Sequence, residues 1–282
     1  MAVQSKFLAV GAIVPWARAG AGAVATQARG NATFGPRGLA MMAEGVSAPE
    51  ALEQLIAADD DREHRQIGLI DAQGESAIFT GAECLAWAGG LRGNHYAVQG
   101  NLLVDRATVE AIAMTFEESA GELADRLMAA LAAGQRAGGD RRGQQAAALL
   151  VVRENGGYGG DDRYVDLRVD DAAQPIERLK ILLDLHHLTF QAPAEDDWRV
   201  IKGNLCRDLQ RILRHAGQYG GAIDGCYDER TRQALGALVN RENLTMRFRE
   251  TEGLIDQQVL LVLQKRLGLT SDQLGTIEEG DI

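Results

Sequence analysis

Residues 5–27, SKFLAVGAIVPWARAGAGAVATQ, decide the fold of this sequence. The segments 1–14 and 20–27 are apolar and strand-like, and a turn around Pro15-Trp16 separates them. Both segments are too apolar on both faces to lie against water. We therefore expect strands whose two faces are each covered by another layer of the protein.

Further along the chain, strands and helices come in pairs. Ser47 and Glu50 have the spacing of a capping box at the start of a helix, and DAQGE (71–75) has the composition of a hairpin turn. Asp105 is the expected N-cap of another helix. The expected strands are 66–70, 76–80, 96–103, 145–152 and 164–169, and the expected helices are 36–44, 175–188, one from Ser47, one from Asp105 and one around 123–131.

The pairing of the helices favours one architecture. Helices that come in twos must bury their apolar stripes against sheets, and two stacked sheets with helices outside meet that need. We therefore predict an α+β fold, a four-layer αββα sandwich, over residues 1–190. A doubly wound Rossmann arrangement places single helices between strands and fits less well, and the sequence contains no G-x-G-x-x-G or P-loop motif.

The segment QAPAEDDW (191–198) has the composition of a linker, with a proline, acidic residues and no periodicity. After it, three short amphipathic stretches around Leu209, Leu235 and Val259 predict a small three-helix domain over residues 199–270. The tail after Leu269 is acidic, and we expect it to be frayed.

Charge and cysteine content exclude several classes of function. The 282 residues are 46% hydrophobic and carry a net charge of −11, and both predicted domains are acidic, which excludes an electrostatic nucleic-acid surface. Cys84, Cys206 and Cys226 have no metal-ligand spacing, and His186-His187 has no further ligand nearby, so we expect neither a metal nor another cofactor. Few cysteines, no leader and no membrane-spanning stretch favour a cytoplasmic protein without a membrane partner.

Residues 205–239 resemble a helical repeat of the peptidoglycan-binding type. The glycines of the repeat permit positive φ in its turn, and Asp224 can bond to neighbouring backbone. The resemblance implies binding of peptidoglycan fragments, whereas a docking module that binds no glycan is the alternative. The matching positions are Leu209-Gln210, Gly220-Gly221, Ile223-Asp224-Gly225 and Thr231.

Nearly the whole chain resembles an uncharacterised bacterial family of the Ntn (N-terminal nucleophile) hydrolase superfamily, whose members often end in a peptidoglycan-binding-like module. The resemblance rests on SKFLAVGAIVPWARAGAGAVATQA, FGPRGLAMM, YAVQGNLL and AGGDRRGQQAAALLVV. It implies the αββα sandwich and hydrolysis of a small amide or peptide-like substrate. In that chemistry the side chain of an N-terminal Thr, Ser or Cys attacks a carbonyl, and its own α-amine is the general base.

The sequence departs from this family at its start. Members usually have a further strand ahead of the AVQSKF segment (2–7), and that strand begins with a small hydroxyl residue after the initiator Met. This sequence lacks it, so the resemblance implies that the first strand and its nucleophile are missing and that the chain is inactive. A non-catalytic binding or assembly protein on the same scaffold is the alternative, and homo-oligomer formation is left open.

Three residues are candidate catalytic groups. Ser5 and Lys6 lie where a strand would reach the active-site end, and Lys6 can lower the pKa of a nucleophile or hold an oxyanion. A surface pair at a strand end is the alternative for both, and cleavage before Ser5 would cut through a strand. Asn101 either presents its amide to an oxyanion or caps the following helix.

Four residues are candidates for substrate binding. Thr26 and Gln27 end a strand, where they either line a cleft or cap the connection. Asp140 and Arg142 belong to the glycine-rich loop GGDRRG (138–143), in which arginine can hold a substrate carboxylate in bidentate fashion. A surface loop with a glycine C-cap is the alternative for this loop. We expect Asp140, Arg142, Thr26 and Lys6 to converge at one end of the sandwich.

Overall fold

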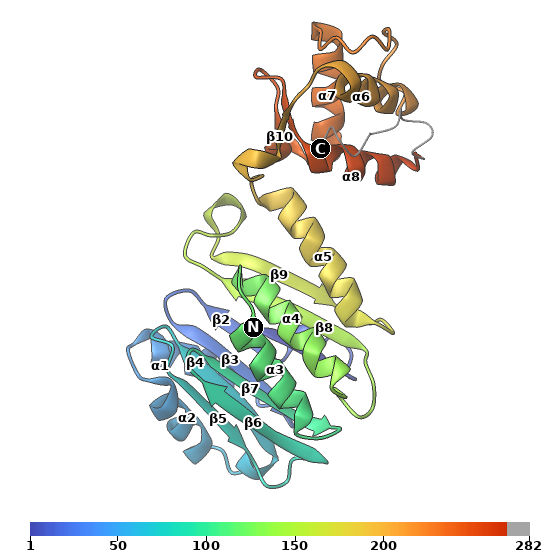
Figure 1. The fold of residues 1–282 in the computed structure, drawn as a ribbon. Coiled ribbons are helices and arrows are strands. Elements are labelled where there is room, and N and C mark those ends of the chain that lie inside the picture. Colours follow the sequence, from blue (N-terminus) through green and yellow to red (C-terminus); the bar gives the residue numbers. More distant parts are fainter. Residues whose placement is uncertain (270–282) are drawn as a thin grey trace. The chain divides into compact units, whose positions relative to one another are not determined.

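The structure, a computed structural model, describes residues 1–269. The contacts within the chain define two compact units, Met1–Asp184 and Leu185–Ile282 (Figure 1). The sequence predicts domains at 1–190 and 199–270, whereas the contacts assign residues 185–190 to the second unit. The expected frayed tail after Leu269 lies outside the described residues. None of the described helices has the length and hydrophobicity that a bilayer crossing requires.

The first unit begins with a four-stranded antiparallel sheet in the order β2-β3-β4-β5. Two helices pack on one face of this sheet, and Phe34, Leu55 and Ile67 are fully buried between helices and sheet. The capping box of the second helix is confirmed, because Ser47 and Glu50 exchange side-chain to backbone hydrogen bonds. The elements are β2 (Pro15–Arg18), β3 (Gly22–Ala28), β4 (Arg65–Asp71), β5 (Ser76–Thr80), α1 (Phe34–Ala43) and α2 (Ala48–Ala57).

The predicted turn at Pro15-Trp16 is wrong, and so is the single strand over residues 1–14. Pro15 and Trp16 begin the edge strand β2, a position where the missing N–H of proline is tolerated. The chain turns instead at Gly20, whose φ is 73°. Residues 1–14 form the short strand β1 (Ala2–Ser5) and a 3₁₀ turn at Val10–Ala12.

The second layer of the first unit consists of two strand groups, β1-β8-β9 and the hairpin β6-β7. Helix α3 packs on the hairpin, α4 packs on β1 and β8, and the two helices pack against each other. Since β7 contacts β4 and β8 contacts β2, the layer faces the first sheet. The bounds are β6 (Trp87–Gly93), β7 (Tyr96–Leu103), β8 (Ala146–Val152), β9 (Arg163–Val169), α3 (Ala107–Glu118) and α4 (Leu123–Arg136).

The layers confirm the predicted αββα sandwich: α1 and α2, the first sheet, the second strand layer, then α3 and α4 (Figure 1). Helix α5 (Pro175–Phe190) adds Ile176, Leu179 and Leu183 to the core on the outer side of β8 and β9. The loop 153–162 joins β8 to β9 as an antiparallel hairpin.

The second unit contains the three predicted helices and a small sheet that the sequence did not indicate. Leu209, Leu235 and Val259 meet in one buried cluster, together with Leu188 from the end of α5. Trp198 opens β10 and pairs with Asp256, although its segment has the composition of a linker. The elements are α6 (Gly203–His215), α7 (Glu229–Arg241), α8 (Gln257–Leu267), β10 (Trp198–Val200), β11 (Phe248–Arg249) and β12 (Leu254–Asp256).

Candidate active site

The glycine-rich loop 138–143 turns the carboxylate of Asp140 towards the end of β1. Gly138 and Gly139 have φ values of 127° and 62°, which are readily adopted only by residues without a side chain. The turn places Asp140 opposite Leu103 of β7 in an isolated antiparallel bridge. Asp140 is only 6% exposed, so its charge requires partners.

The partners of Asp140 come from the loop itself and from the end of β1. Arg142 donates from Nε to Oδ1 (3.0 Å), from Nη2 to Oδ2 (2.7 Å) and from its backbone N–H (2.9 Å). The backbone N–H of Lys6 donates to Oδ2 (3.1 Å), and the Ser5 hydroxyl lies 3.5 Å from the same oxygen. Burial alone would raise the pKa of Asp140, but these hydrogen bonds outweigh it and lower the pKa.

This arrangement limits the chemistry of Ser5 and Arg142. A carboxylate with a lowered pKa is a weak base, so Asp140 does not activate the Ser5 hydroxyl. The guanidinium of Arg142 already makes a bidentate contact with Asp140, and its Nη2 also donates to the Ser5 hydroxyl (3.4 Å). Few of its N–H groups are therefore left to contact a substrate. The hydrogen bonds that Arg142 donates to Asp140 also raise the pKa of Arg142, which keeps the pair ionised.

We expect Asp140→Asn to lower the free energy of unfolding at pH 7 by about 1–3 kcal/mol, because it weakens a buried charged hydrogen-bond network. The variant should also lose less stability than the unmodified chain when the pH falls below 3.8. The folded pKa lies below that ordinary value, so the stabilisation is complete above it and disappears as the pH falls through the folded pKa. Urea unfolding at pH 7 and pH 3 measures both effects. In the control variant Asp60→Asn, at an exposed aspartate, the loss of unfolding free energy between pH 7 and pH 3 should equal that of the unmodified chain. An equally large loss in Asp140→Asn would contradict the prediction.

Lys6 takes part in this cluster through its backbone. Its side chain is exposed, and Nζ donates to the carbonyl of Gln144 (3.2 Å). Lys6 is not among the residues that line the adjoining cavity. The catalytic role that the sequence suggested for its ammonium group therefore has no geometric support here and stays a prediction.

Buried amide groups connect the first sheet to the β6-β7 hairpin. Gln66, which is fully buried, donates from Nε2 to the carbonyl of Gly100 (2.8 Å) and to the hydroxyl of Thr80 (2.9 Å). Its Oε1 accepts from Gln27 and from Asn101, each at 3.0 Å. Asn101 and Gln27 thus meet at Gln66, a residue that the sequence analysis missed.

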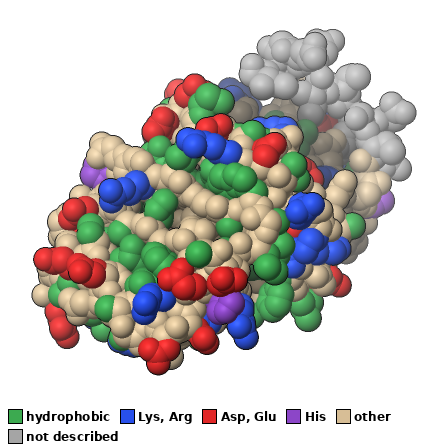
Figure 2. Space-filling view, turned by 90° about the horizontal axis from the view of Figure 1, so that it is seen from below, with side chains coloured by type: hydrophobic (Ala, Val, Ile, Leu, Met, Phe, Trp, Pro, Cys, Tyr) green, Lys and Arg blue, Asp and Glu red, His purple; other side chains and the backbone are tan. Residues whose placement is uncertain are grey.

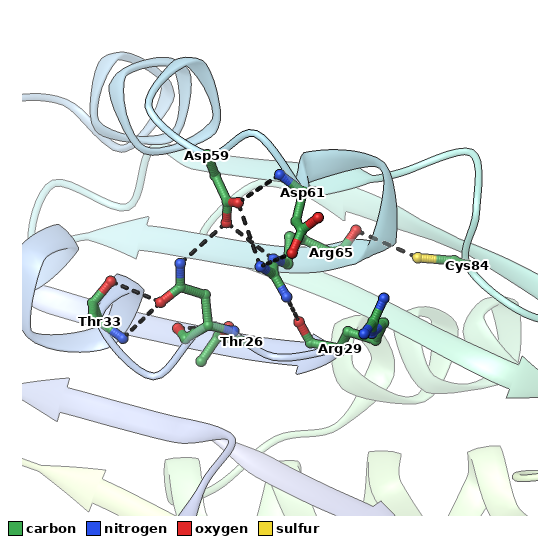
Figure 3. A network of polar contacts seen from close by, with 8 residues as sticks. Thr26, Arg29, Thr33, Asp59, Asp61, Arg65 and Cys84 are labelled. Carbon is green, nitrogen blue, oxygen red and sulfur yellow. Dashed lines mark hydrogen bonds and ion pairs between the residues drawn. The ribbon is translucent and has the colours of Figure 1, made fainter.

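Thr26 is 1% exposed and holds the turn that follows β3. Its hydroxyl donates to the carbonyl of Asn31 and accepts from the N–H of Asn31, both at 3.2 Å. The Asn31 amide then donates to Asp59 (3.1 Å), which lies in the loop before β4 (Figure 3). The hydrogen bonds of Thr26 cap the connection, which is one of the two roles that the sequence suggested for this residue.

Asp59 and Arg65 extend the same network (Figure 3). Arg65 donates from Nε to Asp59 (3.0 Å), approaches Asp61 (3.3 Å) and bonds to the carbonyl of Arg29. The hydrogen bond from Arg65 outweighs burial and lowers the pKa of Asp59, so the pair is ionised at neutral pH. The network fixes the loops 29–33 and 57–65 against each other.

A cavity of about 1310 Å³ adjoins the Ser5–Asp140 cluster and several of the other predicted site residues. Six of the seven predicted site residues line it, and Lys6 is the exception. The cavity also reaches the inner strands of the first sheet and the inner faces of α3 and α4. The six are Ser5, Thr26, Gln27, Asn101, Asp140 and Arg142.

Met1 lines the cavity at the other end of β1. Its α-amine donates to the carbonyl of Leu150 (2.5 Å), while Ser5 pairs with Ala146. Burial of the amine lowers its pKa to about 5. Ser5 lies four residue steps along the strand from Met1, a distance of about 13 Å, so the amine cannot act as a base for that hydroxyl. Within residues 1–269 no three His, Cys, Asp or Glu side chains form a group that could hold a metal ion.

Fold and site together define an α+β protein with a cavity between its sheets, followed by a small helical domain. The chain belongs to a family of unknown function, DUF1028, whose sequence model matches residues 1–179. Residues 189–263 match the model of a putative peptidoglycan binding domain.

One solved structure supports this family assignment. It is the crystal structure of a Silicibacter pomeroyi protein described by the same family model, and it is similar with a TM-score of 0.61 and 27% sequence identity. The match covers 70% of this chain and 89% of the other. No curated protein matches the sequence.

Proposed function

We propose that the first unit is the scaffold of an amidohydrolase of the N-terminal-nucleophile type, acting on a small amide or peptide-like substrate. The observation that supports this most is the cavity between the two sheets, which ends at the Ser5, Asp140 and Arg142 cluster. Uncharged amide donors near this end, such as Asn101, are suited to an oxyanion. Asp140 and Arg142 would position the substrate.

The described residues do not contain the nucleophile that this chemistry needs. The α-amine belongs to Met1, whose thioether is no nucleophile for acyl transfer, and the Ser5 hydroxyl has no effective base. The alternative is a non-catalytic binding protein on the same scaffold, and it is favoured by the hydrogen bonds that Asp140 and Arg142 make with each other.

The surface charges argue against one class of partner. On the face shown in Figure 2, acidic and basic side chains are interspersed, so this face offers no continuous basic surface to nucleic acid.

For the second unit we propose a role in binding peptidoglycan fragments, which its family match supports. Co-sedimentation of the full chain with insoluble peptidoglycan tests this role. A chain that stays in the supernatant at all concentrations would favour a docking module without a glycan ligand.

We expect the given chain to show negligible turnover of small amides, γ-glutamyl compounds and acyl-amino compounds. A version with a strand ahead of AVQSKF that begins with Thr after Met removal should hydrolyse at least one of them, since a hydroxyl then lies beside a free α-amine. The matched control begins the same strand with Val. Turnover by the given chain that is lost in Ser5→Ala would contradict the proposal, and inactivity of the Thr version on every substrate would favour the binding protein.

A further inference from the structure

Three charged or titratable side chains at one end of the first sheet take no part in the networks described above. Arg29, His64 and Glu83 all line the cavity. Their side chains form no hydrogen bond or ion pair with any residue of the part of the chain that the structure describes. Arg142 differs from them, because its guanidinium is already bound to Asp140. The three groups are therefore available to a ligand in the cavity.

The order of the strands brings these side chains to the same edge of the sheet. Arg29 follows β3, His64 precedes β4 and Glu83 follows β5, and the three strands are neighbours. The backbone N–H of Arg29 donates to the carbonyl of His64 (3.1 Å). The backbone N–H of Glu83 donates to the carbonyl of Glu63 (2.8 Å). Neighbouring strands lie about 4.8 Å apart, so the backbones of Arg29 and Glu83 are about 10 Å apart, and their side chains can contact the same small ligand.

The network in Figure 3 holds the backbone of Arg29 without engaging its side chain. Arg65 donates to the carbonyl of Arg29, and the charge of Arg65 is paired with Asp59. In Figure 3, no dashed line reaches the guanidinium group of Arg29, which points away from Asp59. The backbone of Arg29 is therefore fixed at the edge of the cavity, and its charge is left for a ligand.

Glu83 provides an acidic group on the other side of His64. The neighbouring Glu63 accepts from the N–H of Ala82 (3.0 Å), and its other oxygen lies 3.7 Å from Arg62, whereas the carboxylate of Glu83 has no partner among residues 1–269. A guanidinium group recognises a carboxylate, an imidazole can donate a further hydrogen bond, and a carboxylate recognises an ammonium group. A ligand with a carboxylate and an ammonium group on the same carbon would satisfy all three side chains.

The buried amide groups lie directly beside this edge. Gln27 and Gln66 face each other in the β3–β4 ladder, and each is two residues from the charged edge. Gln66 also accepts from Asn101 (3.0 Å), which lines the cavity together with Gln27. Two residues along a strand span about 6.6 Å, so an amino acid held at the edge would present an amide at the end of its side chain to this cluster.

We propose that Arg29, His64 and Glu83 bind the α-amino-acid head group of a ligand whose side chain ends in an amide, such as glutamine or a γ-glutamyl compound. Arg29 and His64 bind the carboxylate, and Glu83 binds the ammonium group. The inference rests on the proposed function, because the side-chain amide of this ligand is the group that would be hydrolysed. Binding of the head group needs no nucleophile, so it can be measured on the given chain.

Three probes that share one carbon chain separate the two charges. L-Glutamine has both, glutaramic acid lacks the ammonium group, and 4-aminobutanamide lacks the carboxylate. In NMR titrations of the full chain, the dissociation constant of L-glutamine should be at least about tenfold lower than that of either analogue, because each analogue lacks one charged contact. Equal affinities for the three probes, or no measurable binding of L-glutamine, would overturn the proposal.

Two variants test which residue binds which charge. Arg29→Met should weaken binding of L-glutamine at least about tenfold and leave that of 4-aminobutanamide unchanged, because this probe has no carboxylate. Glu83→Gln should weaken binding of L-glutamine to a similar extent and leave that of glutaramic acid unchanged. The matched control is Arg37→Met, at an exposed arginine outside the cavity lining, which should bind all three probes like the unmodified chain. Arg29→Met and Arg37→Met variants that bind L-glutamine equally well would show that the assignment is wrong.

The result can be separated from that of the proposed hydrolysis. Selective binding of L-glutamine, without turnover by the version that begins with Thr, would favour the binding protein and support this inference. Turnover of amides by that version, without any preference for the head group, would favour the hydrolase and overturn this inference.

Discussion

The variant Arg247→Met is expected to lower the free energy of unfolding of the second unit by about 3–5 kcal/mol. Arg247 is 5% exposed, and it forms an ion pair with Asp256, which is fully buried. It also donates to the carbonyls of Leu188 (2.6 Å) and His187 (3.0 Å). Methionine fills a similar volume but leaves a buried carboxylate without its partner.

Urea unfolding of the full chain, followed by amide exchange in α6 to α8, measures this loss. Arg241→Met is the matched control, since Arg241 is 46% exposed in its ion pair with Glu242 and should cost less than about 1 kcal/mol. The double variant Arg247→Met/Asp256→Asn should lose less unfolding free energy than the two single variants together, because it no longer contains the buried carboxylate of Asp256. Equal losses for Arg247→Met and Arg241→Met would contradict the prediction.

Gln66→Leu is expected to destabilise the first unit by about 2–4 kcal/mol. The change leaves the carbonyl of Gly100 and the amides of Gln27 and Asn101 without a buried partner, and each such loss costs about 1–3 kcal/mol. It also disconnects the first sheet from the β6-β7 hairpin at the candidate site.

The comparison is with Gln73→Leu, at an exposed glutamine in the β4–β5 turn, which should change stability by less than about 0.5 kcal/mol. Thermal unfolding and the amide side-chain resonances of Asn101 report the two effects. A Gln66 variant as stable as the Gln73 variant, with an unshifted Asn101 signal, would mean that the amide cluster has no structural role.

Elements specified by local patterns could be predicted from the sequence. Strands β5 and β7 have the predicted bounds, 76–80 and 96–103, because a hairpin turn or an apolar alternation marks them. Strand β6 was missed because WAGGLRG has three glycines and little strand propensity. Its glycines are explained by close packing: a Cβ at Gly90 would lie 2.4 Å from the carbonyl of Val98.

The candidate site was only partly predictable. Ser5 and Asp140 are 135 residues apart in the sequence but lie in contact, because the end of a strand and the glycine-rich loop lie at the same end of the sandwich. This contact could be predicted from the expected order of strands. The network of Asn31, Asp59 and Arg65 was not anticipated, because each is a single polar residue whose partner depends on loop paths. One feature of the sequence could have indicated the buried amide cluster, namely the polar residue Gln66 near the start of an apolar strand.

The lowered pKa of the Met1 amine has a consequence for chemical labelling. At pH 6 an amine with a pKa of about 5 is mostly neutral and nucleophilic, while ordinary lysine side chains remain protonated. A small acylating reagent at this pH should therefore distinguish Met1 from the lysines by charge state. The rate of labelling then depends on how often the amine leaves the Leu150 carbonyl. Labelling at Met1 therefore measures how often the first residues of β1 separate from β8.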